Sequence, residues 1–209
     1  MAFSDFKHID QVLSLYPLRV RAERFLPEAA LELPQLFQEN LNFVLDRRAA
    51  DESESFVRES LMYPFLQLAW RRHPRLKLWL QPSLIADDKL QGEPDYLLAV
   101  LPDEVITKLI NKPLLAAVEA KKQDFTQGWA QCLAEMLACQ KSNGSDRITV
   151  YGIVSTGFTW EFGKLTQNTF IRDPRAFSLT EPSRLFGVLD HVFAECERQA
   201  FPTSAQPGL

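Results

Sequence analysis

Leu114-Leu-Ala-Ala-Val-Glu-Ala-Lys121 is an apolar run that ends in a carboxylate and an ammonium group. The run is typical of a buried strand. Because side chains alternate along a strand, Glu119 and Lys121 should project from one face while Ala120 packs on the other. Charged groups at the end of a buried strand are costly unless they are paired or bound to something. The stretch therefore predicts a strand that delivers an acid and an amine to one site.

A second carboxylate precedes a second apolar run. Gly92-Glu-Pro-Asp95 leads into the short apolar segment 96–101, which has the composition of another buried strand. Antiparallel pairing of these two strands would bring Asp95 near Glu119. Two carboxylates and a strand carbonyl form an oxygen-rich site suited to Mg²⁺, which takes oxygen ligands at about 2.1 Å. Such an ion can activate water and stabilise charge on a phosphoryl oxygen, with Lys121 beside it.

The remaining pattern alternates between helical and strand periods. Apolar residues at helical spacing, caps and turn residues predict helices over 10–18, 33–50, from the N-cap Ser53 onward with a break at Pro64, over 125–140 and over 181–199. Alternation and apolar runs predict strands over 76–85 and 96–101 and a hairpin over 148–155 and 159–165. The order of these elements predicts an α/β fold with a central mixed sheet flanked by helices.

The bulk composition is that of an ordinary globular protein. Hydrophobic residues make up 46% and charged residues 24% of 209, which is enough apolar material for one large domain. We divide the chain into an N-terminal helical segment packed on the core (1–50), the main domain (51–201) and a frayed tail (202–209). Cys132, Cys139 and Cys196 lack paired spacing and are expected to be buried reduced thiols.

The same features bear on location and partners. No apolar run is long enough to cross a bilayer, and the N-terminus lacks the pattern of a signal peptide, so a cytoplasmic protein without a membrane partner is expected. The net charge of −4 argues mildly against a protein that coats nucleic acid non-specifically. It leaves a nuclease open, because carboxylates of a metal site are offset by the cation.

Pro94-Asp95 … Glu119-Ala120-Lys121 resembles the signature of the PD-(D/E)XK nuclease superfamily. The similarity extends from about residue 53 to 165, and its pattern is closest to the N-terminal nuclease domain of type I restriction enzyme motor subunits and their stand-alone relatives. Three further segments carry it, namely Ser53-Glu54 … Arg58 in the opening helix, Gly128-Trp-Ala-Gln131 in the later helix and Thr156–Phe162 in the hairpin.

The resemblance implies a restriction-endonuclease-like fold and Mg²⁺-dependent hydrolysis of DNA, with Mn²⁺ able to substitute. Asp95, Glu119 and the carbonyl of Ala120 match the metal ligands, and Lys121 matches the catalytic lysine. Glu54 matches the acidic residue of the first helix, and Glu59 is the competing candidate for that role. Gln131 matches the glutamine of the Gln-x-x-x-Tyr element, but Glu135 stands where the tyrosine would be.

Other interpretations stay open. A catalytically inactive nuclease-fold module that binds nucleic acid or a protein partner is the main alternative, and a purely structural Glu119–Lys121 pair is the second. The cationic run 71–77 could bind phosphate or could be a solvated helix end. DNA is the expected partner, and the sequence does not distinguish a homodimer from a larger restriction- or repair-type assembly.

Overall fold

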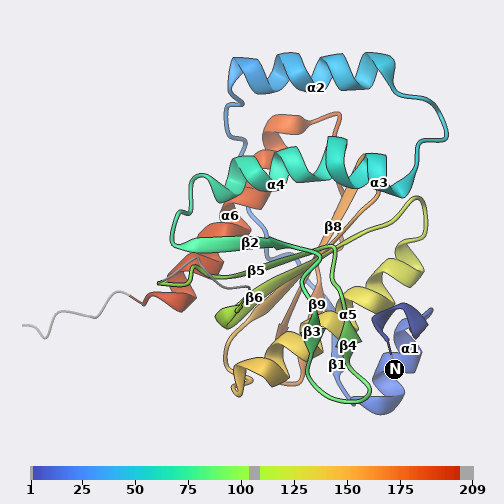
Figure 1. The fold of residues 1–209 in the computed structure, drawn as a ribbon, viewed down its shortest axis with the longest axis vertical. Coiled ribbons are helices and arrows are strands. Elements are labelled where there is room, and N and C mark those ends of the chain that lie inside the picture. Colours follow the sequence, from blue (N-terminus) through green and yellow to red (C-terminus); the bar gives the residue numbers. More distant parts are fainter. Residues whose placement is uncertain (1, 104–108, 203–209) are drawn as a thin grey trace, which may run out of the picture.

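The fold is built on one large mixed sheet, seen in a computed structural model that describes residues 2–103 and 109–202 (Figure 1). The sheet has eight strands in the order β1-β9-β8-β7-β6-β5-β2, and β10 pairs with β8. Its strands are β1 (Arg19–Ala22), β2 (Leu76–Leu80), β5 (Tyr96–Val100), β6 (Asn111–Ala120), β7 (Val150–Ser155), β8 (Thr159–Thr166), β9 (Thr169–Arg172) and β10 (Phe177–Ser178). A small second sheet pairs β3 (Leu84–Ile85) with β4 (Gln91–Gly92).

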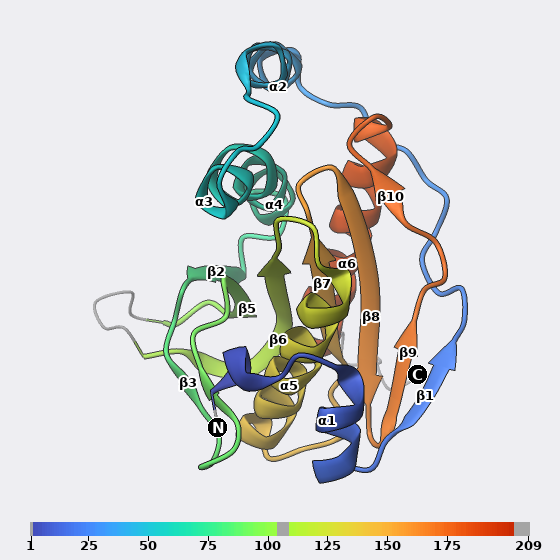
Figure 2. The same ribbon diagram turned by 90° about the vertical axis from the view of Figure 1, so that its right-hand side faces the viewer.

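Helices cover both faces of the large sheet (Figures 1 and 2). They are η1 (Phe3–Asp5), α1 (Ile9–Leu15), α2 (Gln35–Arg47), α3 (Glu54–Phe56), the π-helical turn η2 (Val57–Met62), α4 (Tyr63–Trp70), α5 (Phe125–Asn143) and α6 (Pro182–Ala200). One apolar layer joins α5 and α1 to one face, and a second joins η2, α4 and α6 to the other. Helix α2 lies outside α4, farther from the sheet than any other helix in Figure 2.

The centre of the sheet has a simple topology. Strands β2, β5 and β6 run antiparallel in succession, then α5 crosses the sheet and β7 returns parallel to β6. Strands β6 and β5 are almost wholly buried because they carry apolar residues on both faces and lie between two helical layers. This arrangement brings the carboxyl-terminal end of β6 beside the amino-terminal end of β5.

The helix that precedes β2 is divided as Pro64 predicts. It begins at Ser53, whose Oγ accepts a hydrogen bond from the Phe56 backbone N–H at 3.1 Å. Pro64 lies in the first turn of α4, and the chain before it widens into η2. Single π-helical turns are frequent at functional sites, and η2 carries Arg58 and Glu59.

Most predicted elements are confirmed, including the α/β class with its mixed sheet, the hairpin of β7 and β8, and helices α5 and α6. Helix α5 ends at Gly144, which adopts a left-handed φ of 66°.

All three cysteines are buried and free. None of the described helices combines the length and the apolar character that a bilayer span requires.

The structure corrects the reading of the first fifty residues as helical. Residues 19–22 form β1, an edge strand parallel to β9. All four of its residues are exposed, so the strand has no apolar face that a sequence pattern could reveal. The predicted strand 76–85 also ends early, because Gln81 turns with a φ of 45°. Residues 104–108, between β5 and β6, lie outside the described residues, as does the predicted tail from 203 onward.

Candidate active site

Asp95 and Glu119 lie at adjacent strand ends. Tyr96 pairs with Val118 in the antiparallel β5–β6 ladder, and Asp95 and Glu119 are the next residues along each strand. Partners across an antiparallel ladder share a face, and here that face is the one covered by α5. Both side chains are largely buried, at 9% and 7% exposed. The predicted meeting of these two acids on one side of the sheet therefore agrees with the register of the strands.

The Asp95 carboxylate is held by two donors. Oδ2 accepts a hydrogen bond from the Ala120 backbone N–H at 2.8 Å, and Oδ1 accepts one from Arg58 at 3.0 Å. Arg58 also contacts Glu59 at 3.2 Å, and its own backbone carbonyl accepts from the Tyr96 hydroxyl. Burial alone would lower the pKa of Arg58, but its hydrogen bonds to Asp95 and Glu59 outweigh burial and raise it. The π-helical turn therefore places a firmly protonated guanidinium against the first predicted ligand.

Glu119 and Lys121 form the second pair. Lys121 Nζ lies 2.5 Å from Glu119 Oε1. Burial, reinforced by the nearby charge of Asp95, raises the pKa of Glu119 to about 7, although Lys121 acts in the opposite direction. Burial would lower the pKa of Lys121, but the charge and hydrogen bond of Glu119 prevail and raise it. Burial thus favours the neutral form of Glu119, whereas Glu119 favours the charged form of Lys121.

Helix α5 adds a third acid that the sequence reading did not select. Glu135 is 1% exposed and lies within hydrogen-bonding reach of Glu119. Burial, with the charge of Glu119, raises the pKa of Glu135 well above its ordinary value. Gln131, one turn earlier on the same helical face, is 5% exposed. Among the described residues, Gln131 Oε1 and Glu135 Oε2 have no hydrogen-bond donor.

The close approach of α5 depends on Gly128. A Cβ at this position would lie 2.6 Å from Val154 Cγ1 and 3.0 Å from Lys121 Cγ. Glycine therefore lets the first turns of α5 press against β6 and β7. The result is a layer in which Gly128, Gln131 and Glu135 succeed one another over the strand that carries Glu119 and Lys121.

The two competing acids of the opening helix lie in different surroundings. Glu54 is exposed, and its charge acts on Lys121. Glu59 is also exposed, but it pairs with Arg58. Glu54 therefore interacts electrostatically with Lys121, whereas Glu59 forms an ion pair with Arg58.

Most cations of the run 71–77 form ion pairs away from the acidic site. Arg72 and Arg75 pair with Asp190 and Glu197 of α6, and His73 lies between those two carboxylates. This cluster belongs to the α4–α6 contact on the opposite layer. It does not join the acidic site.

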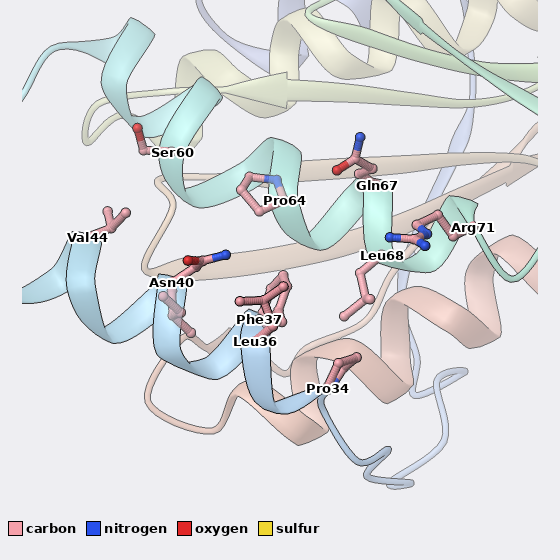
Figure 3. Close-up of a pocket in the computed structure, with 11 residues that line it drawn as sticks. Pro34, Leu36, Phe37, Asn40, Val44, Ser60, Pro64, Gln67, Leu68 and Arg71 are labelled. Atoms are coloured by element: carbon pink, nitrogen blue, oxygen red, sulfur yellow. The ribbon is translucent and has the colours of Figure 1, made fainter.

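Two hollows mark the surface. One, of about 370 Å³, lies between α2 and the η2–α4 helix, and Phe37, Val44 and Leu68 help to line it (Figure 3). The other, of about 140 Å³, is lined by Arg48, Lys122 and Phe158, among others. Lys122 follows the catalytic lysine candidate directly, so the second hollow opens at the same end of the sheet as the acidic site.

No group of three or more His, Cys, Asp or Glu side chains within residues 2–103 and 109–202 is arranged as a ready metal cage. In the present arrangement the charges of Lys121 and Arg58 lie on the two predicted ligands instead. No protein-family model matches the chain, and a search of curated proteins gives no match either.

The sequence does not predict that Arg58 and Glu135 belong to the site. In the sequence, Glu135 stands out only as a departure from the tyrosine of the family element. Its signal was available, however, since it is the sole acid within the apolar stretch 129–139, four residues after Gln131. Arg58 belongs to the opening-helix segment that carries the resemblance, but an arginine in an amphipathic helix is ordinarily solvated, so the sequence assigns it no partner in the site.

Proposed function

We propose that the chain is a metal-dependent hydrolase of phosphodiester bonds in DNA. The observation that carries this proposal is the meeting of Asp95, Glu119 and Lys121 at two adjacent strand ends. An ammonium group and two carboxylates in one buried corner have few structural uses and suit chemistry at a phosphate.

The fold supports the same proposal. The succession of the α3–η2–α4 helix, three antiparallel strands, a crossover helix and a parallel strand is the plan of a restriction-endonuclease-like core, and we propose that this chain has that fold. The acids then lie where the second and third core strands meet. Strands β8, β9, β10 and β1 would be additions on the far side of β7.

The residues present fit a hard divalent cation. Mg²⁺ is a hard cation that binds oxygen ligands, chiefly carboxylates and water, and buried oxygens of Gln131 and Glu135 lack donors within the described part of the chain. Asp95, Glu119 and the Ala120 carbonyl would hold Mg²⁺ or Mn²⁺. The bound ion would neutralise charge on the phosphate and make water more acidic.

The side chains supply orientation and charge. Lys121 would leave Glu119 and turn its ammonium group toward a phosphate oxygen or the attacking water, where negative charge develops. Arg58 would keep its hydrogen bond to Asp95, which fixes the rotamer of that carboxylate. Glu54 lies where it can favour the protonated form of Lys121.

Cations near the site favour a nucleic acid as substrate. Arg48 and Lys122 line the hollow at the same end of the sheet, and the Arg48 guanidinium lies 4.3 Å from the centre of the Phe158 ring. Phosphate contacts by such side chains position a nucleic acid without reading its sequence. They would offset the net negative charge of the protein locally.

One observation favours the inactive module as the second candidate. Both oxygens of Asp95 accept hydrogen bonds from the protein, and Lys121 closes on Glu119. If these ion pairs persist, the site cannot take up a metal ion, and the protein would bind a nucleic acid or a protein partner through its outer surface without catalysis.

Cleavage assays separate the two. Purified protein is incubated with plasmid, linear duplex, single-stranded DNA and RNA in Mg²⁺, in Mn²⁺ and in EDTA. Metal-dependent cleavage that is lost in Asp95→Asn and Glu119→Gln supports the hydrolase. Nucleic-acid binding without turnover in any metal would instead establish the module, and turnover that survives both substitutions would overturn the proposed site.

A further inference from the structure

The inner side of the acidic site contains buried oxygens that have no hydrogen-bond partner among the described residues. Glu135 lies against Glu119, and both are buried. Buried polar atoms in native proteins are almost always hydrogen-bonded, so an acceptor without a donor calls for a water or a cation. Glu135 Oε2 and Gln131 Oε1 are two such acceptors on one face of α5, considering only residues that the structure describes.

Lys121 and Cys132, which interact electrostatically with Glu135, and Trp129 of the same helix already have hydrogen-bond partners. Lys121 Nζ is bonded to Glu119, and the Trp129 indole N–H donates to Glu161 at 2.6 Å. The Cys132 thiol points to the Ala117 and Ile153 carbonyls on the sheet. A small side-chain rotation therefore does not supply the missing donor from these neighbours.

We propose that Glu135 is an additional acidic ligand of the cation, facing Glu119 from α5, with the Gln131 amide oxygen beside it. This inference rests on the proposed function and names a ligand that the family resemblance does not supply. The ion would lie between β6 and α5 and would be held from both the sheet and the helix. A carboxylate at position 135 thereby gives the site one more negative charge than a tyrosine would.

The contrasting explanation is structural. A protonated Glu135 could donate a hydrogen bond to Glu119 and serve only to fill the space under α5. Glu135→Gln keeps the size and can still donate through its amide group, so a structural role predicts that this variant behaves as wild type toward metal. Ligation by Glu135 predicts that it does not.

The test is Mn²⁺ binding to the full chain, measured by calorimetric titration at pH 8 together with the rise in Tm at saturating Mn²⁺. We expect Glu135→Gln to weaken Mn²⁺ binding by about 10–100-fold and to reduce the Tm rise, while the metal-free Tm stays equal to or above that of wild type. Glu135→Met, similar in volume, should lose affinity at least as much. Glu161→Gln is the matched control, because Glu161 already receives donors from Trp129 and Arg172.

The outcomes separate this inference from the proposed function. If Glu119→Gln abolishes Mn²⁺ binding and Glu135→Gln and Glu135→Met bind as wild type does, Glu135 is not a ligand, and the proposed function stands. If wild type binds no Mn²⁺, or Glu119→Gln binds it unchanged, both fail. Equal weakening in Glu161→Gln would also overturn the assignment, because the effect would then be general.

Discussion

Asp173 and the Glu119–Glu135 pair are both buried acids, but their surroundings are opposite. Asp173 accepts hydrogen bonds from the backbone N–H groups of Phe25 and Leu26 and from the Arg175 backbone and guanidinium. Burial would raise the pKa of Asp173, but these donors prevail and lower it to about 2. Glu119 has one ammonium partner and acidic neighbours, and burial raises its pKa to about 7.

The comparison distinguishes a structural acid from a functional candidate. Asp173 ties the chain at residues 25–26 to the end of β9, and its charge is fully compensated. The acids beneath α5 are undercompensated, which costs stability unless something positive is added. Burial alone therefore does not mark a candidate site, whereas several buried acids that share too few donors do.

The largest effect should come from removing the ammonium group of the undercompensated site. We expect Lys121→Met to lower kcat for DNA cleavage in Mg²⁺ by about 10²–10³-fold, because a charge aimed at the developing negative charge is lost. Single-turnover cleavage at saturating protein measures this. Lys141→Met is the matched control, since Lys141 is exposed, lies in the last turn of α5, far from Gly128 and Lys121, and pairs with Asp87. Equal loss in both variants would contradict the role of Lys121.

Asp173→Asn should affect stability and nothing else. Breaking this buried ion pair leaves Arg175 without its main partner and should lower the free energy of unfolding by about 3 kcal/mol. Urea denaturation gives this value. Mn²⁺ affinity at a temperature where the variant is folded should remain that of wild type, and a variant that loses metal binding as well would remove the distinction between the two regions.

The pH dependence of the two acids should have opposite signs. In the folded protein the pKa of Glu119 is raised to about 7, against about 4.5 in the unfolded chain. Glu119 therefore adds stability below pH 4.5, and this contribution is lost as the pH rises toward 7. For Asp173 the contribution is present above pH 3.8 and disappears as the pH falls toward 2. Glu119→Gln should therefore gain about 2 kcal/mol relative to wild type between pH 4.5 and pH 7.5 in EDTA. If the free energy of unfolding of wild type and of Glu119→Gln changed equally with pH across this range, the raised pKa of Glu119 would be refuted.

The smallest effect concerns the contact that places α5 over Lys121. Gly128→Ala introduces a methyl group that meets Val154 and Lys121, and such overpacking should cost about 1–3 kcal/mol and lower cleavage by displacing the lysine. Gly152→Ala is the comparison variant, because its methyl group meets Cys132 Sγ at 3.0 Å and otherwise the flexible end of Met136, and it does not touch Lys121. It should lose less stability and keep full cleavage, as thermal unfolding and the DNA assay would show.

The sequence was informative where apolar pattern and chemistry coincide. Both strands of the site, and the placement of Glu119 and Lys121 on one face, followed from alternation and from the apolar run. The edge strand 19–22 could not be found, because it is exposed on every side and is defined only by its partner β9. Arg58 could not be assigned to Asp95 either, because the two residues are 37 positions apart and meet only through the packing of η2 against the sheet.

The most direct measurement is a crystal structure of the protein soaked in Mn²⁺, with anomalous scattering used to locate the metal. We predict a peak at about 2.1–2.2 Å from oxygens of both Asp95 and Glu119, with Lys121 turned away from Glu119. A crystal of folded protein in saturating Mn²⁺ that shows no peak there, with Lys121 still bonded to Glu119, would contradict it.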